Sequence, residues 1–299
     1  MQDRAHLPTE QRLLDSSNLD EMPLLHAIDL MHRQDLAAVA AVASQRNEIA
    51  AAVEIFASAL LAGGRVFYFG AGTSGRLGVL DASELPPTFR IDPSLVQGVV
   101  AGGDGAMFRA VEGAEDRADD GAALVDARQI GPNDVVFGIA AGGTTPFVQG
   151  ALRRAIERNA RTIFLSCVPR VEGEPSVDVV IRPVTGPEVI TGSTRLKAGT
   201  ATKLVLNTVS TLAMVRLGKV HGNLMVDLRA SNEKLRDRAT RIVSTITNTT
   251  REEAINLLTR ADCDVKVAVV MHVRNVDAAQ AREIMGNSAG VLRTAMRAT

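Results

Sequence analysis

The stretch FGAGTSGRLG at residues 69–78 follows directly on a strongly apolar run and contains four glycines. It predicts a tight turn between a buried strand and a helix. Backbone N–H groups of Gly72 and Gly75 in such a turn, with the hydroxyls of Thr73 and Ser74, can hold a phosphate group. The stretch has neither the Gly-Lys-Ser/Thr ending of a nucleotide P-loop nor the Gly-x-Gly-x-x-Gly dinucleotide pattern. It therefore predicts a phosphate site that needs no nucleotide; a turn that only packs the helix on the strand is the alternative.

Short apolar runs alternate with helical stretches on both sides of this turn. The runs are RVFYFG (65–70), VQGVVAG (96–102), DVVFGIA (134–140), RTIFLSC (161–167) and VDVVIRP (177–183), and helices are expected near 74–84, near 105–125 and from 146. This order predicts an α/β fold with a parallel sheet and helices on both faces. Ligands of such sheets bind beyond the carboxyl ends of the strands, so the loops after the first three runs are the candidate sites.

The segment before the sheet is expected to be helical. Residues 1 to about 35 are polar, with Pro8 and Pro23 as breakers, and are expected to form an arm or lid. The run from 36 to 62 has apolar residues at spacings of three and four and stops at two glycines. It predicts one long buried helix.

The segment after the sheet is also expected to be helical. A second long helix is predicted over about 196–217, and several short amphipathic segments follow from residue 240. Among them, Thr249 and Glu252 have the spacing of a capping box. The expected domains are an N-terminal arm and helix over 1–50, a sheet domain over 51–235 and a small helical domain over 240–299.

Composition narrows the classes of function. The chain of 299 residues has 33 Lys and Arg against 34 Asp and Glu, so it offers no broad field to nucleic acid or to an acidic membrane. Cys167 and Cys263 lie far apart, without metal-ligand or disulfide spacing. There is no signal-peptide pattern, and no apolar stretch approaches the roughly 18 residues that span a bilayer. A soluble cytoplasmic protein without a metal is expected.

A second loop, AAGGTTPFV at 140–148, follows the third apolar run. Thr145 before Pro146 is typical of an N-cap followed by the first helical residue. With Thr144 and the backbone of the loop, it could complete the same anion pocket.

A third segment, GPEVITGSTRLKAGTATK at 186–203, places Ser193, Thr194, Arg195 and Lys197 at the start of a predicted helix. Cations are disfavoured at a helix N-terminus unless an anion is also present. The segment therefore predicts a bound acidic ligand; a solvated helix start is the alternative.

Two carboxylates are candidates for catalysis. Glu84 in DASELPPTF is predicted to end the helix just before Pro86 and Pro87, where an acid is unfavourable unless it has a partner or a task. Glu115 lies in the acidic cluster VEGAED at 111–116, where a solvated helix face is the simpler interpretation.

Taken together, four strings resemble the N-acetylmuramic acid 6-phosphate etherases, in order and along almost the whole chain. They are GAGTSGRLGVLDASELPPTF (70–89), VEGAED (111–116), GPEVITGSTRLKAGTATKLVLN (186–207) and GKVHGNLMVDL (218–228). The resemblance implies a three-layer sugar isomerase (SIS) domain, a homodimer, and cofactor-free cleavage of N-acetylmuramic acid 6-phosphate to N-acetylglucosamine 6-phosphate and D-lactate in peptidoglycan recycling. It also implies that Glu84 and Glu115 are the catalytic pair. The expected substrate-binding residues are Gly72, Thr73, Ser74, Gly75, Ser83, Thr144, Thr145, Ser193, Thr194 and Lys197.

The second loop departs from the family pattern. The family usually has A-A-S-G-R-T-P, whereas Gly142 and Thr144 here replace the serine and the arginine. Backbone donors and Thr145 remain for a ligand. Leu85 stands where a cysteine is common.

The chemistry needs one base and one acid. In the ring-opened sugar, the aldehyde acidifies the C2 proton; its removal expels lactate from C3, and water then adds back at C3. Two carboxyl groups can share these proton transfers. We expect Glu84 to protonate the lactyl oxygen and Glu115 to act at C2 or on the water.

Two other functions fit a sugar isomerase domain. One is non-catalytic sugar-phosphate sensing, since the glucokinase regulatory protein shares the GSTRLK-like segment. The other is aldose-ketose phosphate isomerisation, which needs no acid for an ether oxygen. Against sensing, the chain has room for one such domain and keeps both carboxylates; release of D-lactate would exclude both alternatives.

Overall fold

A computed structural model describes residues 7–228 and 233–297. Its internal packing divides the chain into two compact units. The sheet unit comprises the chain up to Ser83 and Pro93–Ser210, and the helical unit comprises Glu84–Asp92 and the chain from Thr211 onward. The domain boundaries expected near residues 50 and 235–240 stay a prediction.

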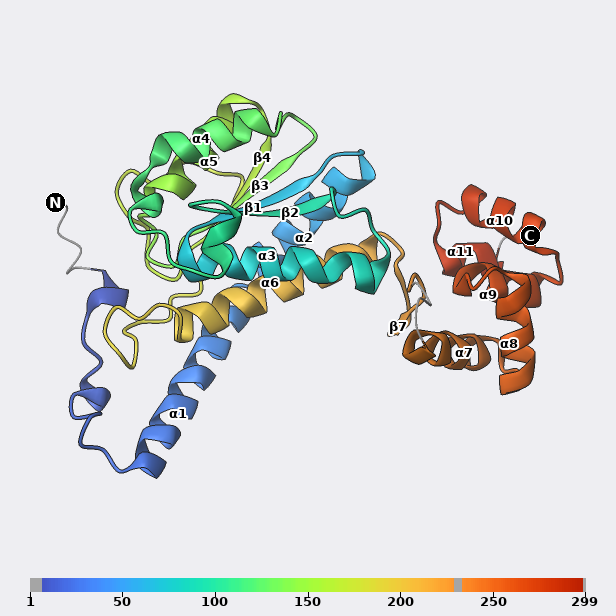
Figure 1. The fold of residues 1–299 in the computed structure, drawn as a ribbon, viewed down its shortest axis with the longest axis horizontal. Coiled ribbons are helices and arrows are strands. Elements are labelled where there is room, and N and C mark those ends of the chain that lie inside the picture. The colour runs from blue at the N-terminus through green and yellow to red at the C-terminus, as the bar shows by residue number, and fades with distance from the viewer. Residues whose placement is uncertain (1–6, 229–232, 298–299) are drawn as a thin grey trace. The chain divides into compact units, whose positions relative to one another are not determined.

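Five parallel strands form the centre of the sheet unit, in the order β2-β1-β3-β4-β5 (Figure 1). They are β1 Val66–Gly70, β2 Val96–Val100, β3 Val135–Ile139, β4 Arg161–Leu165 and β5 Val179–Ile181. In the register, Gly70 lies opposite Val100 on one side and Ile139 on the other. All five apolar runs are therefore strands, and β1, β2 and β3 end side by side at one edge of the sheet.

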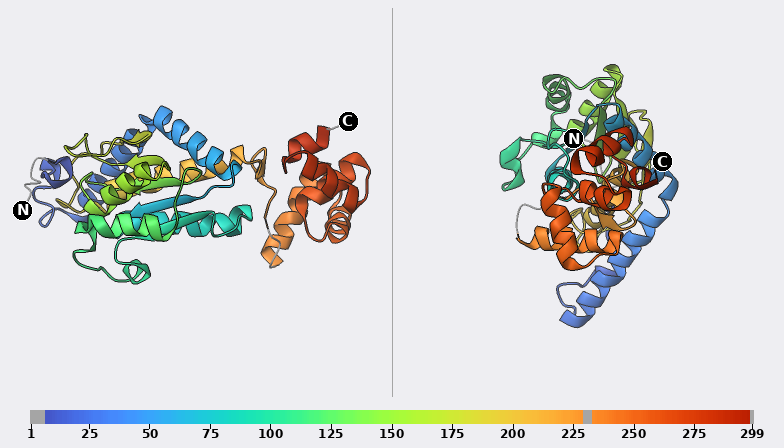
Figure 2. Two further views of the ribbon diagram at one scale, coloured as in Figure 1. Left: turned by 90° about the horizontal axis from the view of Figure 1, so that it is seen from above. Right: turned by 90° about the vertical axis from the view of Figure 1, so that its right-hand side faces the viewer.

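Helices cover both faces of this sheet (Figure 1, Figure 2). They include α2 Arg46–Leu61, α3 Gly72–Phe89, α4 Ala118–Ala127, α5 Pro146–Glu157 and α6 Lys197–Arg216. On the face of α4 and α5, Phe69 of β1 packs against Phe147 with the ring centres 6.0 Å apart. On the opposite face, Tyr68 packs 6.4 Å from Phe56 of α2. The predicted three-layer α/β fold is confirmed.

The N-terminal segment differs from the prediction. Two short turns, η1 Pro8–Glu10 and η2 Leu14–Ser16, precede α1 Leu24–Ala43, and α2 follows after a turn at residues 44–45. The prediction of one helix over 36–62 is wrong. Gln45 provides the physical reason, because its side chain accepts a hydrogen bond from the Arg182 N–H at 2.8 Å and so ties the turn to the end of β5.

Two further helix boundaries differ. α3 continues through Pro86 and Pro87 to Phe89, so the expected end at Glu84 is wrong. The prolines lie in the last turns, where their missing N–H groups remove only two helical bonds. The predicted helix over 105–125 is also wrong.

The segment after β2 contains two short turns and a helix. These are η3 Asp104–Met107, η4 Ala114–Asp116 and α4. Gly113 interrupts the helical pattern because it adopts a left-handed conformation, with φ +72°. The interruption sets Glu115 in the short turn η4, in a hollow that it shares with Gly72.

The helical unit confirms the predicted helical tail. It contains a hairpin of β6 Val220–His221 and β7 Leu224–Met225, followed by α7 Glu233–Thr247, α8 Arg251–Arg260, α9 Val265–Arg274, α10 Ala278–Asn287 and α11 Leu292–Arg297. α9 is central, since its residues from Val265 to Met271 are buried, and all of them except Lys266 belong to one apolar cluster. The capping box is one residue later than predicted, at Thr250 and Glu253, because Thr250 is the residue with extended backbone before α8.

Candidate functional site

The glycine turn joins β1 to α3 by a close approach of two backbones. A Cβ on Gly70 would lie 2.6 Å from the Gly75 nitrogen, and a Cβ on Gly75 would lie 2.6 Å from the Gly70 oxygen. Neither position accepts a side chain. Gly72 has φ +51°, a conformation that favours glycine, and it opens α3. The first turn of α3 therefore presents its N–H groups at the carboxyl edge of the sheet, with Thr73 and Ser74 half-buried beside them.

Glu115 shares a hollow with this turn. The hollow has a volume of about 170 Å³, and its lining includes Gly72, Arg76 and Glu115. Arg76 connects α3 to η3, since its Nε donates to the carbonyls of Ala106 at 3.0 Å and Met107 at 3.1 Å. Glu115 is exposed, as the sequence favoured, yet the structure brings it to the predicted phosphate turn.

The third predicted segment also lies beside the glycine turn. A Cβ on Gly199, in the first turn of α6, would lie 3.7 Å from Cγ2 of Thr73 and 3.5 Å from the carbonyl oxygen of Thr194. Ser193 and Thr194 are half-buried in the turn before α6, and Arg195 is exposed. The N-termini of α3 and α6 therefore meet at the same edge.

The anion at the start of α6 is a residue of the chain itself. Glu188 is 0% exposed, and its carboxylate accepts hydrogen bonds from the Lys197 N–H at 2.9 Å and the Ala198 N–H at 3.0 Å. Burial raises the pKa of Glu188, while those two N–H groups and the Lys197 charge oppose the rise. Sequence reasoning missed Glu188, which satisfies the requirement for an anion without a bound ligand. The sequence does contain a signal for this role, because Glu188 is an acidic residue in the segment just before α6.

Lys197 is buried and engaged within the protein. Its ammonium donates to Oε1 of Gln34 in α1 at 2.7 Å. Burial lowers the pKa of Lys197, and the charges of Glu188 and Asp35 oppose this shift. A role for Lys197 in substrate binding stays a prediction.

The second loop is held in a tight turn at the end of β3. Gly143 has φ +75°, and a Cβ there would lie 3.2 Å from the Ser166 hydroxyl. Thr145 is the N-cap of α5 as predicted, but its side chain makes no capping bond. Thr144 and Thr145 are half-buried, so their hydroxyls remain candidates for a ligand at this edge.

The N-terminal turn η1 reaches the same edge, which the sequence did not indicate. The Gly192 N–H donates to the carbonyl of Thr9 at 3.1 Å. The hydroxyl of Thr9 lies 3.9 Å from the point where a Cβ on Gly142 would stand. Residues before the predicted sheet therefore contact the third candidate segment at Gly192 and lie near the second at Gly142.

Glu84 and Ser83 lie further along α3, and both are exposed. Glu84 follows Gly72 by twelve residues of one helix, which corresponds to about 18 Å along the axis. The Ser83 hydroxyl donates to the carbonyl of Leu80 at 2.8 Å. The helix therefore keeps Glu84 away from the glycine turn of its own chain.

A buried polar cluster anchors α3 one turn before Glu84. Asp81 accepts hydrogen bonds from the Tyr68 hydroxyl at 2.8 Å and from the Ser210 hydroxyl at 3.0 Å. Burial raises the pKa of Asp81, and both hydrogen bonds oppose the rise. The cluster ties α3 to β1 and α6.

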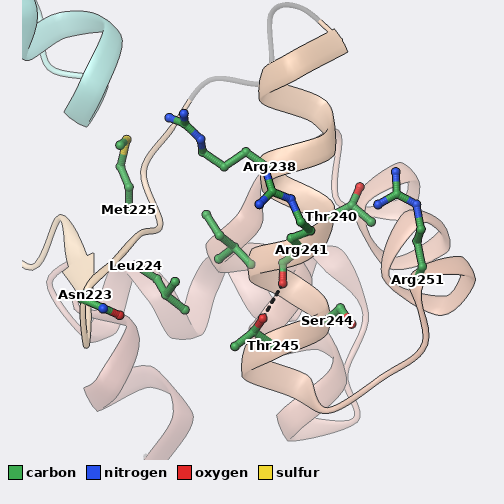
Figure 3. Close-up of a pocket in the computed structure, with 10 residues that line it drawn as sticks. Asn223, Leu224, Met225, Arg238, Thr240, Arg241, Ser244, Thr245 and Arg251 are labelled. Carbon is green, nitrogen blue, oxygen red and sulfur yellow. Dashed lines mark hydrogen bonds between the residues drawn. The ribbon is translucent and has the colours of Figure 1, made fainter.

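A hydroxyl- and arginine-rich pocket of the helical unit is a poor candidate for the chemistry (Figure 3). It has a volume of about 460 Å³ beside α7, and the described residues that line it include no carboxylate. Arg241 and Arg251 both pair with Asp237, at 2.9 and 2.8 Å. The Thr245 hydroxyl donates to the carbonyl of Arg241 at 2.7 Å. These groups stabilise the helices.

Other kinds of site find little support in residues 7–228 and 233–297. No three His, Cys, Asp or Glu side chains gather there as they would around a metal ion. No helix in these ranges is long and apolar enough to cross a membrane. Burial raises the pKa of the Cys167 thiol to about 12, which disfavours a thiolate nucleophile.

Two family models match separate parts of the chain. Residues 48–156 match the glucokinase regulatory protein N-terminal SIS domain. Residues 222–296 match the C-terminal lid domain of glucokinase regulatory protein.

Curated relatives match the whole length. The N-acetylmuramic acid 6-phosphate etherase of Picosynechococcus sp. is 53% identical over 294 residues, covering 98% of this chain and 98% of that protein. The protein of the same name from Rippkaea orientalis is 52% identical over 297 residues, covering 99% and 97%. Among solved structures, a phosphoheptose isomerase from Francisella tularensis aligns with 65% of this chain and all of its own, at 20% identity and a TM-score of 0.49.

Proposed function

Since this chain belongs to the N-acetylmuramic acid 6-phosphate etherase family, we propose that it cleaves the D-lactyl ether of N-acetylmuramic acid 6-phosphate. The products are N-acetylglucosamine 6-phosphate and D-lactate. The observation that carries the proposal is the 53% identity along 98% of the chain. The geometry of the site supports this proposal, because a phosphate turn, hydroxyl-rich loops and a carboxylate lie together at one edge of the sheet.

The phosphate group binds at the glycine turn. The N–H groups at the start of α3 and the hydroxyls of Thr73 and Ser74 are donors suited to a dianion, and the helix dipole adds to the attraction. Ser193, Thr194 and the second loop surround the sugar. The proximity of Gly199 to Thr73 supports this arrangement, because it brings the start of α6 beside the same turn.

The reaction is an elimination followed by hydration. A base removes the C2 proton of the open-chain aldehyde, the C3–O bond breaks, and an acid protonates the departing lactyl oxygen. Water then adds its OH to C3 and a proton returns to C2, so atoms balance without a redox change. On this basis the enzyme is a carbon–oxygen lyase.

Glu115 serves at C2 or on the water. Its carboxylate lines the hollow that also contains Gly72, so it stands near a sugar whose phosphate occupies the glycine turn. Arg76, which lines the same hollow, adds positive charge beside the phosphate. Ser83 and Lys197 are also proposed to bind the substrate, on the basis of the family resemblance alone.

Glu84 protonates the lactyl oxygen, and a second copy of the chain supplies it. About 18 Å of helix separates Glu84 from Gly72 of the same chain, which exceeds the length of a hexose phosphate. In a symmetric dimer, Glu84 of each copy can enter the site of the other. This supports the homodimer that the family resemblance implies.

The outer face of α1 supports the dimer independently. Leu25, Ile28, Leu36 and Val39 share one face of α1 and are 73%, 40%, 69% and 48% exposed. The helix extends away from the rest of the sheet unit (Figure 1, Figure 2). An apolar stripe of this length is typical of a surface that another chain covers.

We also propose that the enzyme works in the cytoplasm, in peptidoglycan recycling. The substrate is an amino sugar of the cell wall that has already been phosphorylated. The free thiols of Cys167 and Cys263 are consistent with a reducing compartment.

The test is release of D-lactate from N-acetylmuramic acid 6-phosphate. Glu84→Gln and Glu115→Gln should each lower the rate about a hundred to ten thousand fold, because the amide keeps the shape but transfers no proton. Asp116→Asn, an exposed neighbour of Glu115, is the matched control and should keep the rate. In heavy water, deuterium exchange at C2 should persist better in Glu84→Gln than in Glu115→Gln. The reverse pattern would exchange their roles, and wild-type rates in both would exclude the pair.

A further inference from the structure

Thr9 carries a hydroxyl that the fold does not use. The residue is 0% exposed, and within the described residues Oγ1 has no hydrogen-bonding partner. Most buried hydroxyls in proteins have a partner, because burial without one costs free energy. A valine would fill the same volume without that cost. The hydroxyl therefore points to a role outside the packing of the fold.

The backbone of the N-terminal turn is held without this hydroxyl. The carbonyl of Thr9 accepts a hydrogen bond from the Gly192 N–H at 3.1 Å. Leu7 anchors the turn, since it is 3% exposed. Oε2 of Glu10 lies 3.2 Å from the point where a Cβ on Gly192 would stand. The side chain of Thr9 is thus presented by a fixed turn beside the segment that leads into α6.

The hydroxyl lies beside the second loop at the carboxyl edge of the sheet. Outside residues 141–143, Oγ1 of Thr9 is the only heavy atom of the described residues within 4 Å of a Cβ built on Gly142, at 3.9 Å. Gly142 lies in the second loop, three residues after the end of β3 and two residues before Thr144. Ligands of parallel sheets bind at this edge, where the loops leave the strands. A ligand over Gly142 would meet the Thr9 hydroxyl.

We propose that Thr9 is a ligand-binding residue whose Oγ1 donates a hydrogen bond to an oxygen of the sugar phosphate over the second loop. The inference rests on the proposed function, since it takes the sugar phosphate as the ligand. A hydroxyl can serve either a phosphoryl oxygen or a sugar hydroxyl. The turn at residues 7–10 is then part of the site.

The experiment compares Thr9→Val, which removes only the hydroxyl, with Thr9→Ser, which keeps it. Titration calorimetry with N-acetylglucosamine 6-phosphate should show a Kd raised about tenfold in Thr9→Val and nearly unchanged in Thr9→Ser. The Tm of the free protein should not fall in Thr9→Val, because the lost group had no partner. Thr208→Val is the matched control, since its hydroxyl donates to the Leu204 carbonyl within α6, and its Kd should equal that of the wild type.

A second titration, with inorganic phosphate, identifies the oxygen. Weaker binding of phosphate in Thr9→Val indicates a phosphoryl oxygen, and weaker binding of the sugar phosphate alone indicates a sugar hydroxyl.

If Thr9→Val does not fold, Gly142→Val replaces it, because its side chain fills the space beside Oγ1 and should weaken sugar-phosphate binding at least about tenfold. Unchanged affinity for both ligands would overturn the proposal, as would a lowered Tm with unchanged affinity. D-lactate release by the wild type, measured in parallel, tests the proposed function separately. If lactate is released but Thr9→Val leaves the Kd unchanged, only the role of Thr9 is refuted. If Thr9→Val raises the Kd but no lactate is released, only the etherase activity is refuted.

Discussion

Mixing two inactive variants tests whether each site combines residues of two chains. A homodimer of Glu84→Gln, or of Glu115→Gln, has the substitution in both of its sites. Its rate of D-lactate release is expected to fall about a hundred to ten thousand fold. In a mixed dimer, one site receives both substitutions and the other receives neither. Random pairing of equal amounts makes about half of the dimers mixed, and each has one intact site of two, so activity should return to about one quarter of the wild type.

The assay is D-lactate release after co-expression of the two variants with different tags, so that mixed dimers can be purified. Purified mixed dimers should recover about half of the wild-type rate, because one of their two sites is intact. A double variant carrying both substitutions, mixed with either single variant, is the control and should stay inactive. If the two carboxylates of one chain acted on the same substrate, every mixture would stay inactive, and the inference from the length of α3 between Gly72 and Glu84 would fail.

Three other features can be tested by substitution: the phosphate turn, the apolar stripe of α1 and the buried Asp81. Thr73→Val combined with Ser74→Ala should raise KM about 10- to 100-fold, since charge-assisted hydrogen bonds to the phosphate are lost, and an unchanged KM would mean that the phosphate binds elsewhere. Leu25→Ser combined with Leu36→Ser should halve the mass measured by light scattering, because these residues belong to the apolar stripe of α1; a dimer mass would remove the stripe from the interface. Burial raises the pKa of Asp81 in the folded protein above its ordinary value of 3.8. The stabilisation from this shift is therefore fully present below pH 3.8, and it is lost as the pH rises through the pKa of Asp81 in the folded state. Urea unfolding of wild type and Asp81→Asn across pH should show the wild type losing its relative stability with rising pH, and a difference independent of pH would contradict this.

The strands were predictable from the sequence because their apolar residues are concentrated in short runs, and β1 and β3 are buried at every position. The helices were less predictable where a distant contact decides the boundary. Gln45 ends α1 by bonding to Arg182, which no local pattern indicates. Likewise, Pro86 and Pro87 are tolerated because they lie in the last turns of α3.

The candidate site was predictable where it depends on local chemistry. Short-range sequence patterns predict the glycine turn, the Thr145 N-cap and the polar and charged residues at the start of α6. The sequence predicted a bound acidic ligand beside Lys197, whereas in the structure the carboxylate there is Glu188, whose partners only the folded loop brings together. Thr9 was missed because its neighbours come from loops more than a hundred residues away.

The proposed mechanism eliminates lactate from C3 and then adds water at the same carbon. It is tested most directly by running the reaction in water labelled with oxygen-18 and locating the label by mass spectrometry. Elimination and hydration predict one labelled oxygen at C3 of N-acetylglucosamine 6-phosphate, assigned by fragmentation, and unlabelled D-lactate. Label in the D-lactate would show that water attacks the lactyl carbon and would contradict the mechanism, and no D-lactate at all would contradict the function.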